Sequence, residues 1–228
     1  MNSDTITSDM LLNAYCSGAF PMGDPDTKEL QWYSPDPRTI QPITPGDFHV
    51  PRRLARTVRQ NKFQVTHDRA FHAVMIECAL SRPGREETWI TEPIIALYCE
   101  LYERGYAHSI ETWLPSDQVD REEMDNALYD SVHDRVLVGG IYGVHLGGAF
   151  FGESMFSRVR DASKVALVKL VEHLQQREFL LFDVQFSNPH IEQFGVLEIS
   201  RAQYMESLHN AIQKPVAWQH AQEKSRSL

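Results

Sequence analysis

Three consecutive stretches in the second half of the chain decide the fold: LVGGIYGVHLGGAFFGESMF (residues 137–156), SKVALVKLVEHLQQRE (163–178) and FLLFDVQF (179–186). The first has two apolar runs around Gly147 and Gly148, which can adopt the positive φ angles of a tight turn, and it predicts a β-hairpin. The second carries apolar residues at helical spacing and predicts an amphipathic helix. The third predicts a buried strand. The order hairpin, helix, strand indicates a mixed α/β body.

Length and composition are those of a globular protein. The 228 residues are 42% hydrophobic and 23% charged, enough to bury a core without disulfides or repeats. No apolar run approaches the roughly 18 residues of a membrane span, and the first residues lack the pattern of a signal peptide. We therefore expect a cytoplasmic protein with no membrane partner. The net charge of −9 argues against a large duplex-binding surface.

Cysteines and histidines indicate neither a disulfide framework nor a metal site. The three cysteines form no C-x-x-C pair and are typical of reduced core thiols. The ten histidines are scattered and form no H-E-x-x-H motif. We expect no metal and no cofactor.

A proline-rich segment from Asp24 to Pro45 surrounds the aromatic pair Trp32 and Tyr33 in QWYSPDPR. Because proline interrupts helices and central strands, we expect a loop that crosses from a small N-terminal unit to the main body. We place the boundary near Pro37. This gives a small N-terminal domain with its linker at 1–37 and a main domain at 38–228.

The region between these landmarks predicts helices over 51–63, 68–80 and 92–105, a strand at 107–114, and an exposed acidic insertion or hairpin arm at 115–134. The first of these helices carries four arginines on one face, Arg52, Arg53, Arg56 and Arg59. Tandem arginines on a short helix are usually only solvated. In an acidic protein they are also the place where a phosphate backbone would bind.

Polar residues interrupt two apolar segments. Asp183 and Gln185 lie two apart in FLLFDVQF, so the period of a strand turns both side chains to one face. Burying them without partners would cost on the order of several kcal/mol, which leaves a structural polar network, a wet strand end or a reaction centre. Glu153 interrupts AFFGESMF and is suited to hold an amino or ammonium group, unless it faces water at an edge.

Motif searches exclude several enzyme classes. The chain has no G-x-S-x-G, no Walker loop and no G-x-G-x-x-G. An acetyl-CoA enzyme of the GNAT type shares the order hairpin, helix, strand. Its pyrophosphate loop follows R/Q-x-x-G-x-G/A, whereas Asp161 stands here at a glycine position. A carboxylate at that turn would repel the pyrophosphate, so CoA is disfavoured.

Seven segments together resemble the leucyl/phenylalanyl-tRNA-protein transferases of the bacterial N-degron pathway. They are WYSPDPR (32–38), TWIT (88–91), AHSIETW (107–113), LVGGIYGV (137–144), GESMFSR (152–158), ASKVAL (162–167) and DVQFSN (183–188). The resemblance implies a GNAT-like acyltransferase domain with a mixed, largely antiparallel sheet behind a small N-terminal domain. It also implies transfer of leucine or phenylalanine, with methionine as a further candidate, from aminoacyl-tRNA to the α-amine of proteins that begin with Arg or Lys.

The resemblance assigns roles to individual residues. Asp183 would orient Gln185 beside the ester, and Glu153 would position the donor. The 3′-adenosine and the tRNA would contact Trp89, Tyr98, Met22, Trp32 and the arginines Arg52, Arg53, Arg56 and Arg59. An apolar pocket for the transferred side chain would be lined by Ile141, Phe150, Met155, Leu167, Leu170 and Leu174.

This sequence departs from the family pattern at three places. Met22 replaces a frequent tryptophan in the adenosine site, Leu170 and Leu174 replace phenylalanines of the acyl pocket, and the acidic segment 115–134 is longer than usual. Two other hypotheses remain beside the transferase: an acetyl-CoA-dependent GNAT enzyme, and a non-catalytic RNA- or degron-binding module. The second would tolerate loss of Asp183 and Gln185.

Overall fold

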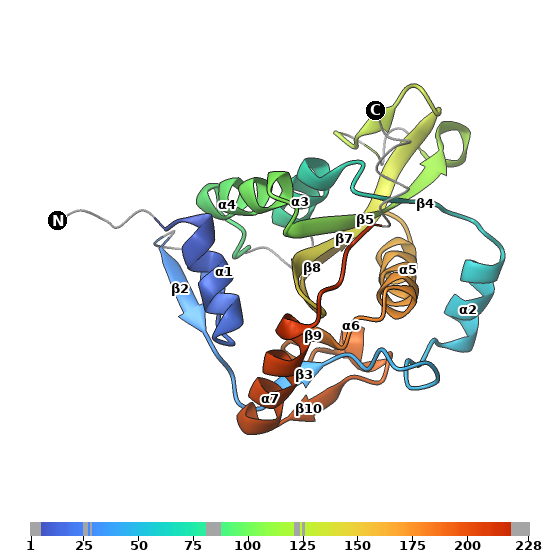
Figure 1. The fold of residues 1–228 in the computed structure, drawn as a ribbon. Helices are drawn as coiled ribbons and strands as arrows, with labels where there is room; N and C mark the ends of the chain where they lie inside the picture. The colour runs from blue at the N-terminus through green and yellow to red at the C-terminus, as the bar shows by residue number, and fades with distance from the viewer. Residues whose placement is uncertain are drawn as a thin grey trace.

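The computed structural model describes residues 6–24, 27, 29–80, 88–120, 124 and 126–219. A mixed sheet with helices on both faces forms the body, and a small N-terminal unit packs beside it (Figure 1). This unit consists of helix α1 (Ser8–Cys16) and a hairpin of β1 (Phe20–Gly23) and β2 (Leu30–Tyr33). The mixed α/β class predicted from the sequence is confirmed. Within the described ranges, no helix is long and apolar enough to cross a membrane.

The main sheet is antiparallel except for one parallel pair. Its order is β10 (Leu197–Ile199), β3 (Arg38–Ile40), β9 (Leu181–Gln185), β8 (Ala149–Ser157), β7 (Arg135–Leu146), β5 (Ala107–Pro115) and β4 (Gln64–His67), with β6 (Tyr129–Asp130) paired to β7. Strands β8 and β9 run parallel, and Phe151 lies opposite Asp183 in their register. A parallel neighbour requires a crossover connection, and helix α5 (Ala162–Gln176) provides it.

The predicted hairpin, helix and strand are present as β7 and β8, α5 and β9. Gly147 has a φ of 56° in the hairpin turn, and a Cβ added there would lie 2.3 Å from the carbonyl oxygen of Ile212. The position therefore requires glycine. Strand β9 is shorter than the predicted 179–186, because Leu180 is exposed and the backbone turns at Gln185, whose φ is 60°.

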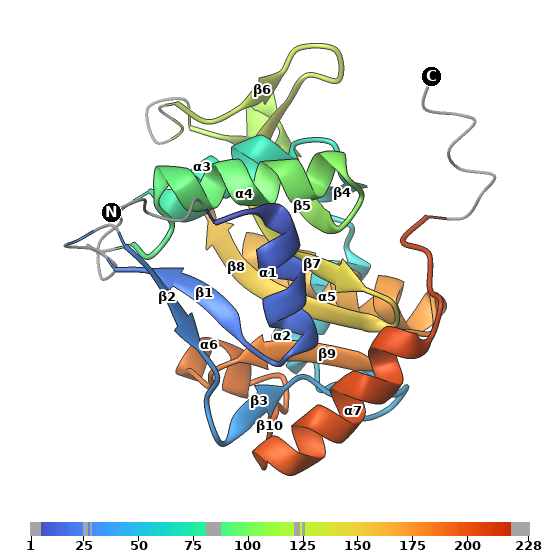
Figure 2. The ribbon, with the colours of Figure 1, turned by 60° about the vertical axis from the view of Figure 1, so that its left-hand side comes forward.

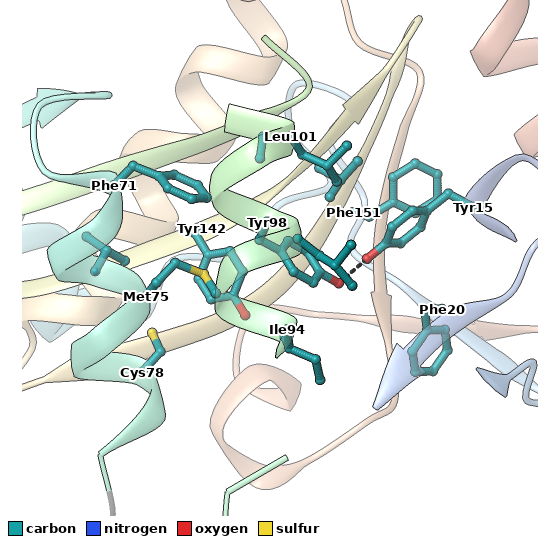
Figure 3. Close-up of a cluster of buried hydrophobic side chains, with 14 of the residues drawn as sticks. Tyr15, Phe20, Phe71, Met75, Cys78, Ile94, Tyr98, Leu101, Tyr142 and Phe151 are labelled. Atoms are coloured by element: carbon teal, nitrogen blue, oxygen red, sulfur yellow. Dashed lines mark hydrogen bonds between the residues drawn. The ribbon is translucent and has the colours of Figure 1, made fainter. Parts of the chain in front are cut away.

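Alternation along the strands directs side chains into two cores on opposite faces of the sheet. Helices α1, α3 (Phe71–Ala79), α4 (Glu92–Glu103) and α7 (Arg201–Gln213) contribute to one core, part of which Figure 3 shows. Helix α5 and, through Leu54, α2 (Arg52–Arg59) contribute to the other. Phe151 belongs to the first core and its neighbour Phe150 to the second.

The expectation of a loop without strands in the proline-rich segment is wrong. Residues Arg38–Ile40 form β3 inside the sheet, between β9 and β10. The three residues contain no proline, and Pro37 stands just before the first of them, where a missing N–H is tolerated. The proline-rich segment therefore supplies one strand to the N-terminal hairpin and another to the main sheet.

The acidic segment 115–134 is described except at 121–123 and 125. It contains a 3₁₀ turn at Ser116–Gln118 and strand β6, which pairs Tyr129 with Val136 at the start of β7. The segment thus returns to the sheet as an arm beside β7, at the top of Figure 2, as the sequence predicts.

Candidate active site

A cavity of about 850 Å³ lies beside the parallel pair β8 and β9. The last paired residues of these two strands are Phe151 and Asp183. The residues that follow them on both strands line the cavity. Glu153 comes from β8 and Gln185 from the end of β9. The fold therefore brings together two of the polar residues that the sequence singles out.

Glu153 accepts hydrogen bonds from three side chains on three different elements. The hydroxyl of Tyr15 on α1 lies 2.6 Å from its Oε1, and the hydroxyl of Tyr98 on α4 lies 3.0 Å from its Oε2. The Nε2 of Gln185 donates to Oε1 at 3.2 Å. The two tyrosine oxygens are themselves 2.5 Å apart (Figure 3). Because Nε2 of Gln185 is used in this way, its Oε1 remains for another partner.

Burial dominates the electrostatics of this cluster. It raises the pKa of Glu153 to about 7, against the hydrogen bonds from Tyr15 and Tyr98, which lower it. Burial, together with the nearby charge of Glu153, also raises the pKa of both tyrosines well above the usual range, so their hydroxyls stay protonated. A carboxyl group that titrates near neutral pH at a cavity wall is typical of a functional site.

Asp183 is held in a buried ion pair away from the cavity lining. The guanidinium of Arg38 donates to it from Nε at 2.9 Å and from Nη2 at 2.6 Å, and both side chains are almost fully buried. The hydroxyl of Tyr204 donates to the same carboxylate at 2.7 Å. Burial alone would lower the pKa of Arg38, but its hydrogen bonds to Asp183 and the charge of that residue raise it overall.

Asp183 contacts Gln185 through the main chain. Its Oδ1 accepts the backbone N–H of Gln185 at 2.9 Å. The sequence suggests that both side chains share one face and act as a side-chain relay. In the structure the direct contact between the two residues is this main-chain hydrogen bond, and the left-handed backbone at Gln185 ends the strand.

The six residues expected in the acyl pocket divide into two groups. Ile141, Met155 and Leu167 line the cavity, together with Phe182 and Val184. The remaining three are buried in the α5-side core and are absent from the described lining: Phe150, Leu170 and Leu174. Half of the expected set therefore lines the cavity, and the other half belongs to the core.

Of the expected adenosine contacts, Tyr98 requires a correction. Its side chain is fully buried, its ring packs edge-on against Tyr142 at 5.6 Å, and its hydroxyl serves Glu153, so no face is free for a base. Met22 is half-buried on β1, and the next residue, Gly23, donates its N–H to the carbonyl of Trp89 at 3.0 Å. Trp32 on β2 is exposed. Met22 and Trp89 are thus brought together at the edge of the N-terminal unit.

The four arginines lie on α2, which packs through Leu54 against the α5-side core. All four side chains are exposed, and none of them is among the residues that line the cavity. The arginine face defined by Arg52, Arg53, Arg56 and Arg59 is therefore not part of the described cavity lining.

Sequence reasoning missed Tyr15, Arg38 and Tyr204 as site residues. Arg38 ends the segment WYSPDPR, whose aromatics Trp32 and Tyr33 are exposed, so its neighbours in the sequence give no sign of an internal ion pair. Tyr15 and Tyr204 stand on amphipathic helices, where a buried tyrosine is ordinarily a core residue. Their roles follow from contacts that span more than a hundred residues or that cross from β9 to α7.

The described residues contain no group of three or more His, Cys, Asp or Glu side chains that could hold a metal ion. Asp161 precedes α5 with a φ of 69°. The position expected to cradle a pyrophosphate therefore has a left-handed backbone, as a glycine would, but also carries a carboxylate.

Comparisons with known proteins agree on one family. The family model for the leucyl/phenylalanyl-tRNA protein transferase matches residues 42–120 and 126–209, and the model for the N-terminal domain of that transferase matches 4–36. The leucyl/phenylalanyl-tRNA–protein transferase of Caulobacter vibrioides is 49% identical over 213 residues, covering 93% of this chain and 88% of that protein. The enzyme of the same name from Salinibacter ruber is 46% identical, covering 94% and 84%.

Among solved structures, the crystal structure of FemX aligns with a TM-score of 0.46 and 14% identity. The alignment covers 87% of this chain, which spans only 64% of the FemX chain.

Proposed function

Because the chain belongs to the leucyl/phenylalanyl-tRNA–protein transferase family, we propose that it moves a leucyl or phenylalanyl group from aminoacyl-tRNA to the N-terminal α-amine of proteins that begin with Arg or Lys. Such a product would enter the N-degron pathway of protein degradation. The observation that carries this proposal is the contact between Glu153 and Gln185 at the wall of an 850 Å³ cavity. The pair places one acidic group and one amide oxygen beside a space large enough for an aminoacyl ester.

The donor amino acid enters the cavity with its side chain toward the apolar wall formed by Ile141, Met155 and Leu167. Its α-ammonium group is attracted to the ionised carboxylate of Glu153 through a charge-assisted hydrogen bond. The ester carbonyl then faces Gln185. This placement fixes the donor at three points and leaves one face of the ester open to the acceptor.

The acceptor amine attacks the ester carbon, a C–N bond forms, and the bond from carbon to the ribose oxygen of the tRNA breaks. The proton released by the amine leaves with the ribose oxygen. Gln185 is a poor base, so its Oε1 serves to accept an N–H of the attacking amine and to aim the nitrogen lone pair. An aminoacyl ester is already activated, and positioning of this kind supplies much of the rate.

Further assignments belong to the same proposal. The adenosine of the donor would stack near Trp89 and Met22, with Trp32 at the rim, and the arginine face of α2 would contact tRNA phosphates. A GNAT-like main domain is supported by the parallel pair β8 and β9, beside which the cavity lies. A division near Pro37 is supported by the separate family model over 4–36. A cytoplasmic location follows because aminoacyl-tRNA is made there.

The test is a transfer assay with leucyl-tRNA or phenylalanyl-tRNA and a peptide that begins with Arg, read by mass spectrometry. We expect a peptide extended by one residue, and no product from the same peptide with an acetylated N-terminus. A reaction with acetyl-CoA in place of aminoacyl-tRNA is expected to give nothing, because Asp161 opposes the pyrophosphate. Absence of extended peptide with either aminoacyl-tRNA would exclude the proposed activity.

The variant Gln185→Ala is expected to lower turnover about a hundredfold while the Kd for aminoacyl-tRNA changes little, because aiming the amine acts on the reaction step. Gln213→Ala on the exposed end of α7 is the matched control and should keep the wild-type rate. Wild-type turnover in Gln185→Ala would rule out the role of the amide.

A further inference from the structure

We propose that Arg38 and Tyr204 are positioning residues for the transfer reaction, acting through the carboxylate of Asp183 to hold Gln185 in a strained turn. The inference rests on the proposed function, because it explains how the amide that aims the amine is kept in place. It assigns a task to two residues that lie outside the cavity and touch no substrate.

The backbone at Gln185 is strained. Its φ is 60°, which is uncommon for a residue other than glycine, and the N–H of Phe186 donates to the carbonyl of Val184 at 2.7 Å. A hydrogen bond between residues i and i+2 around a positive φ defines a classic γ-turn, which is rare and strained. Such a conformation is energetically unfavourable and persists only when its surroundings enforce it.

The enforcing contact is made by Asp183. Its Oδ1 accepts the N–H of Gln185 at 2.9 Å, at the residue where the chain leaves the strand geometry. A carboxylate free to rotate could not fix that N–H. Here the carboxylate is locked by three further hydrogen bonds from Arg38 and by one from Tyr204 at 2.7 Å.

Arg38 is itself fixed in position. Its guanidinium lies between the rings of Phe20 and Tyr204, 4.6 and 4.5 Å from their centres, and its Nη1 donates to the carbonyl of Gly18 at 3.2 Å. The neighbouring β3 also pairs with β9, and Thr39 lies opposite Gln185. The N-terminal unit therefore packs against Arg38, while β3 and α7 supply the two side chains that bind the carboxylate.

The direction of the Gln185 side chain depends on this arrangement. The turn sets the Cα–Cβ bond, and from there Nε2 reaches Oε1 of Glu153 at 3.2 Å. In an ordinary extended strand the φ of this residue would be negative and the amide would be displaced. Misplacement by about 1 Å can reduce a positioned reaction by roughly a hundredfold.

The deciding experiment is a double-mutant cycle of Tyr204→Phe with Gln185→Ala, measured as the single-turnover transfer rate at saturating aminoacyl-tRNA. Tyr204→Phe keeps the ring over Arg38 and removes only the hydroxyl that locks Asp183. We expect the rate to fall about tenfold or more in the single variant, with the Kd for aminoacyl-tRNA within about twofold of wild type. In the Gln185→Ala background we expect Tyr204→Phe to have no further effect, since the group it positions is gone.

Tyr102→Phe is the matched control, because it also removes one tyrosine hydroxyl hydrogen bond, to the carbonyl of Asp68, and it should keep the wild-type rate. Arg38→Lys is the second variant for the same cycle if Tyr204→Phe does not fold. A folded variant with the wild-type rate, or an equal loss with and without Gln185, would overturn the proposal. Failure of the wild type to extend the peptide would instead refute the transferase function, so the two failures are distinguishable.

Discussion

At the scale of single residues, Glu153 is the side chain that connects the polar residues of the site. It receives hydrogen bonds from Tyr15, Tyr98 and Gln185. The two tyrosine hydroxyls supply two hydrogens. Three contacts need one each: two from the tyrosines to Glu153, and the 2.5 Å contact between the tyrosine oxygens themselves. A proton on Glu153 would complete this set, which agrees with the raised pKa of about 7. The carboxyl group therefore changes charge near neutral pH.

The first prediction concerns this titration. The proposed function needs ionised Glu153 to attract the donor ammonium, so the single-turnover rate should rise with pH through about 7. The acceptor amine adds a second rise near its own pKa of about 8. Glu153→Gln should be slower above about pH 7, should approach the wild-type rate at lower pH, and should lose the rise near 7 while keeping that of the amine. An unchanged pH profile in Glu153→Gln would contradict this assignment.

Residue types predicted part of this site and missed the remainder. Glu153 and Gln185 were predictable because polar side chains in apolar strands need partners. Arg38 and Tyr204 were not, because the partner of Asp183 comes from a strand 145 residues away in the chain and from a helix beyond β9. The left-handed turn at Gln185 also left no signal, since glutamine is a residue that ordinarily avoids it.

At the scale of elements, local periodicity predicted the long hairpin, α5 and β9, because each has enough residues to show its period. Strand β3 is different: it has three residues, of which Arg38 and Thr39 are polar but buried. It exists because β9 and β10 supply its hydrogen bonds on both sides. A strand of this kind depends on its partners, and so the sequence alone suggested a loop.

The second prediction concerns α2. If the arginine face binds tRNA phosphates, replacing Arg52 and Arg56 with Gln should weaken binding of aminoacyl-tRNA. The slope of log K against log salt should also become less steep, by roughly 1–2. Binding of an aminoacyl-adenosine, which has no phosphate backbone, should not change. Lys169→Gln on α5 removes a cation elsewhere and is the control. A salt slope equal to wild type in the double variant would refute the patch.

At the scale of the whole molecule, buried glutamates and buried histidines make opposite contributions to the pH dependence of stability. Burial raises the pKa of Glu111 and Glu153 to about 7 from 4.5. It lowers the pKa of His145 to about 4 and that of His173 to about 3 from 6.5. Between pH 4.5 and 7 the folded state therefore holds protons on the two glutamates that the unfolded state has lost, so their contribution to stability falls as pH rises. Between about pH 4 and 6.5 the unfolded state binds protons on the histidines, so their contribution rises with pH.

These opposing contributions lead to the last prediction. Glu111 on β5 is fully buried, accepts hydroxyls from Ser109 and Thr66, and does not line the cavity. Glu111→Gln removes one of the two contributions to stability that fall as pH rises. The free energy of unfolding of the variant should therefore increase relative to that of wild type by up to roughly 1 kcal/mol per pH unit between pH 4.5 and 7. Urea unfolding at pH 5, 6 and 7 measures this difference, and the transfer rate of the variant should match wild type. A difference between variant and wild type that does not change with pH would show that Glu111 is ionised across this range in the folded protein.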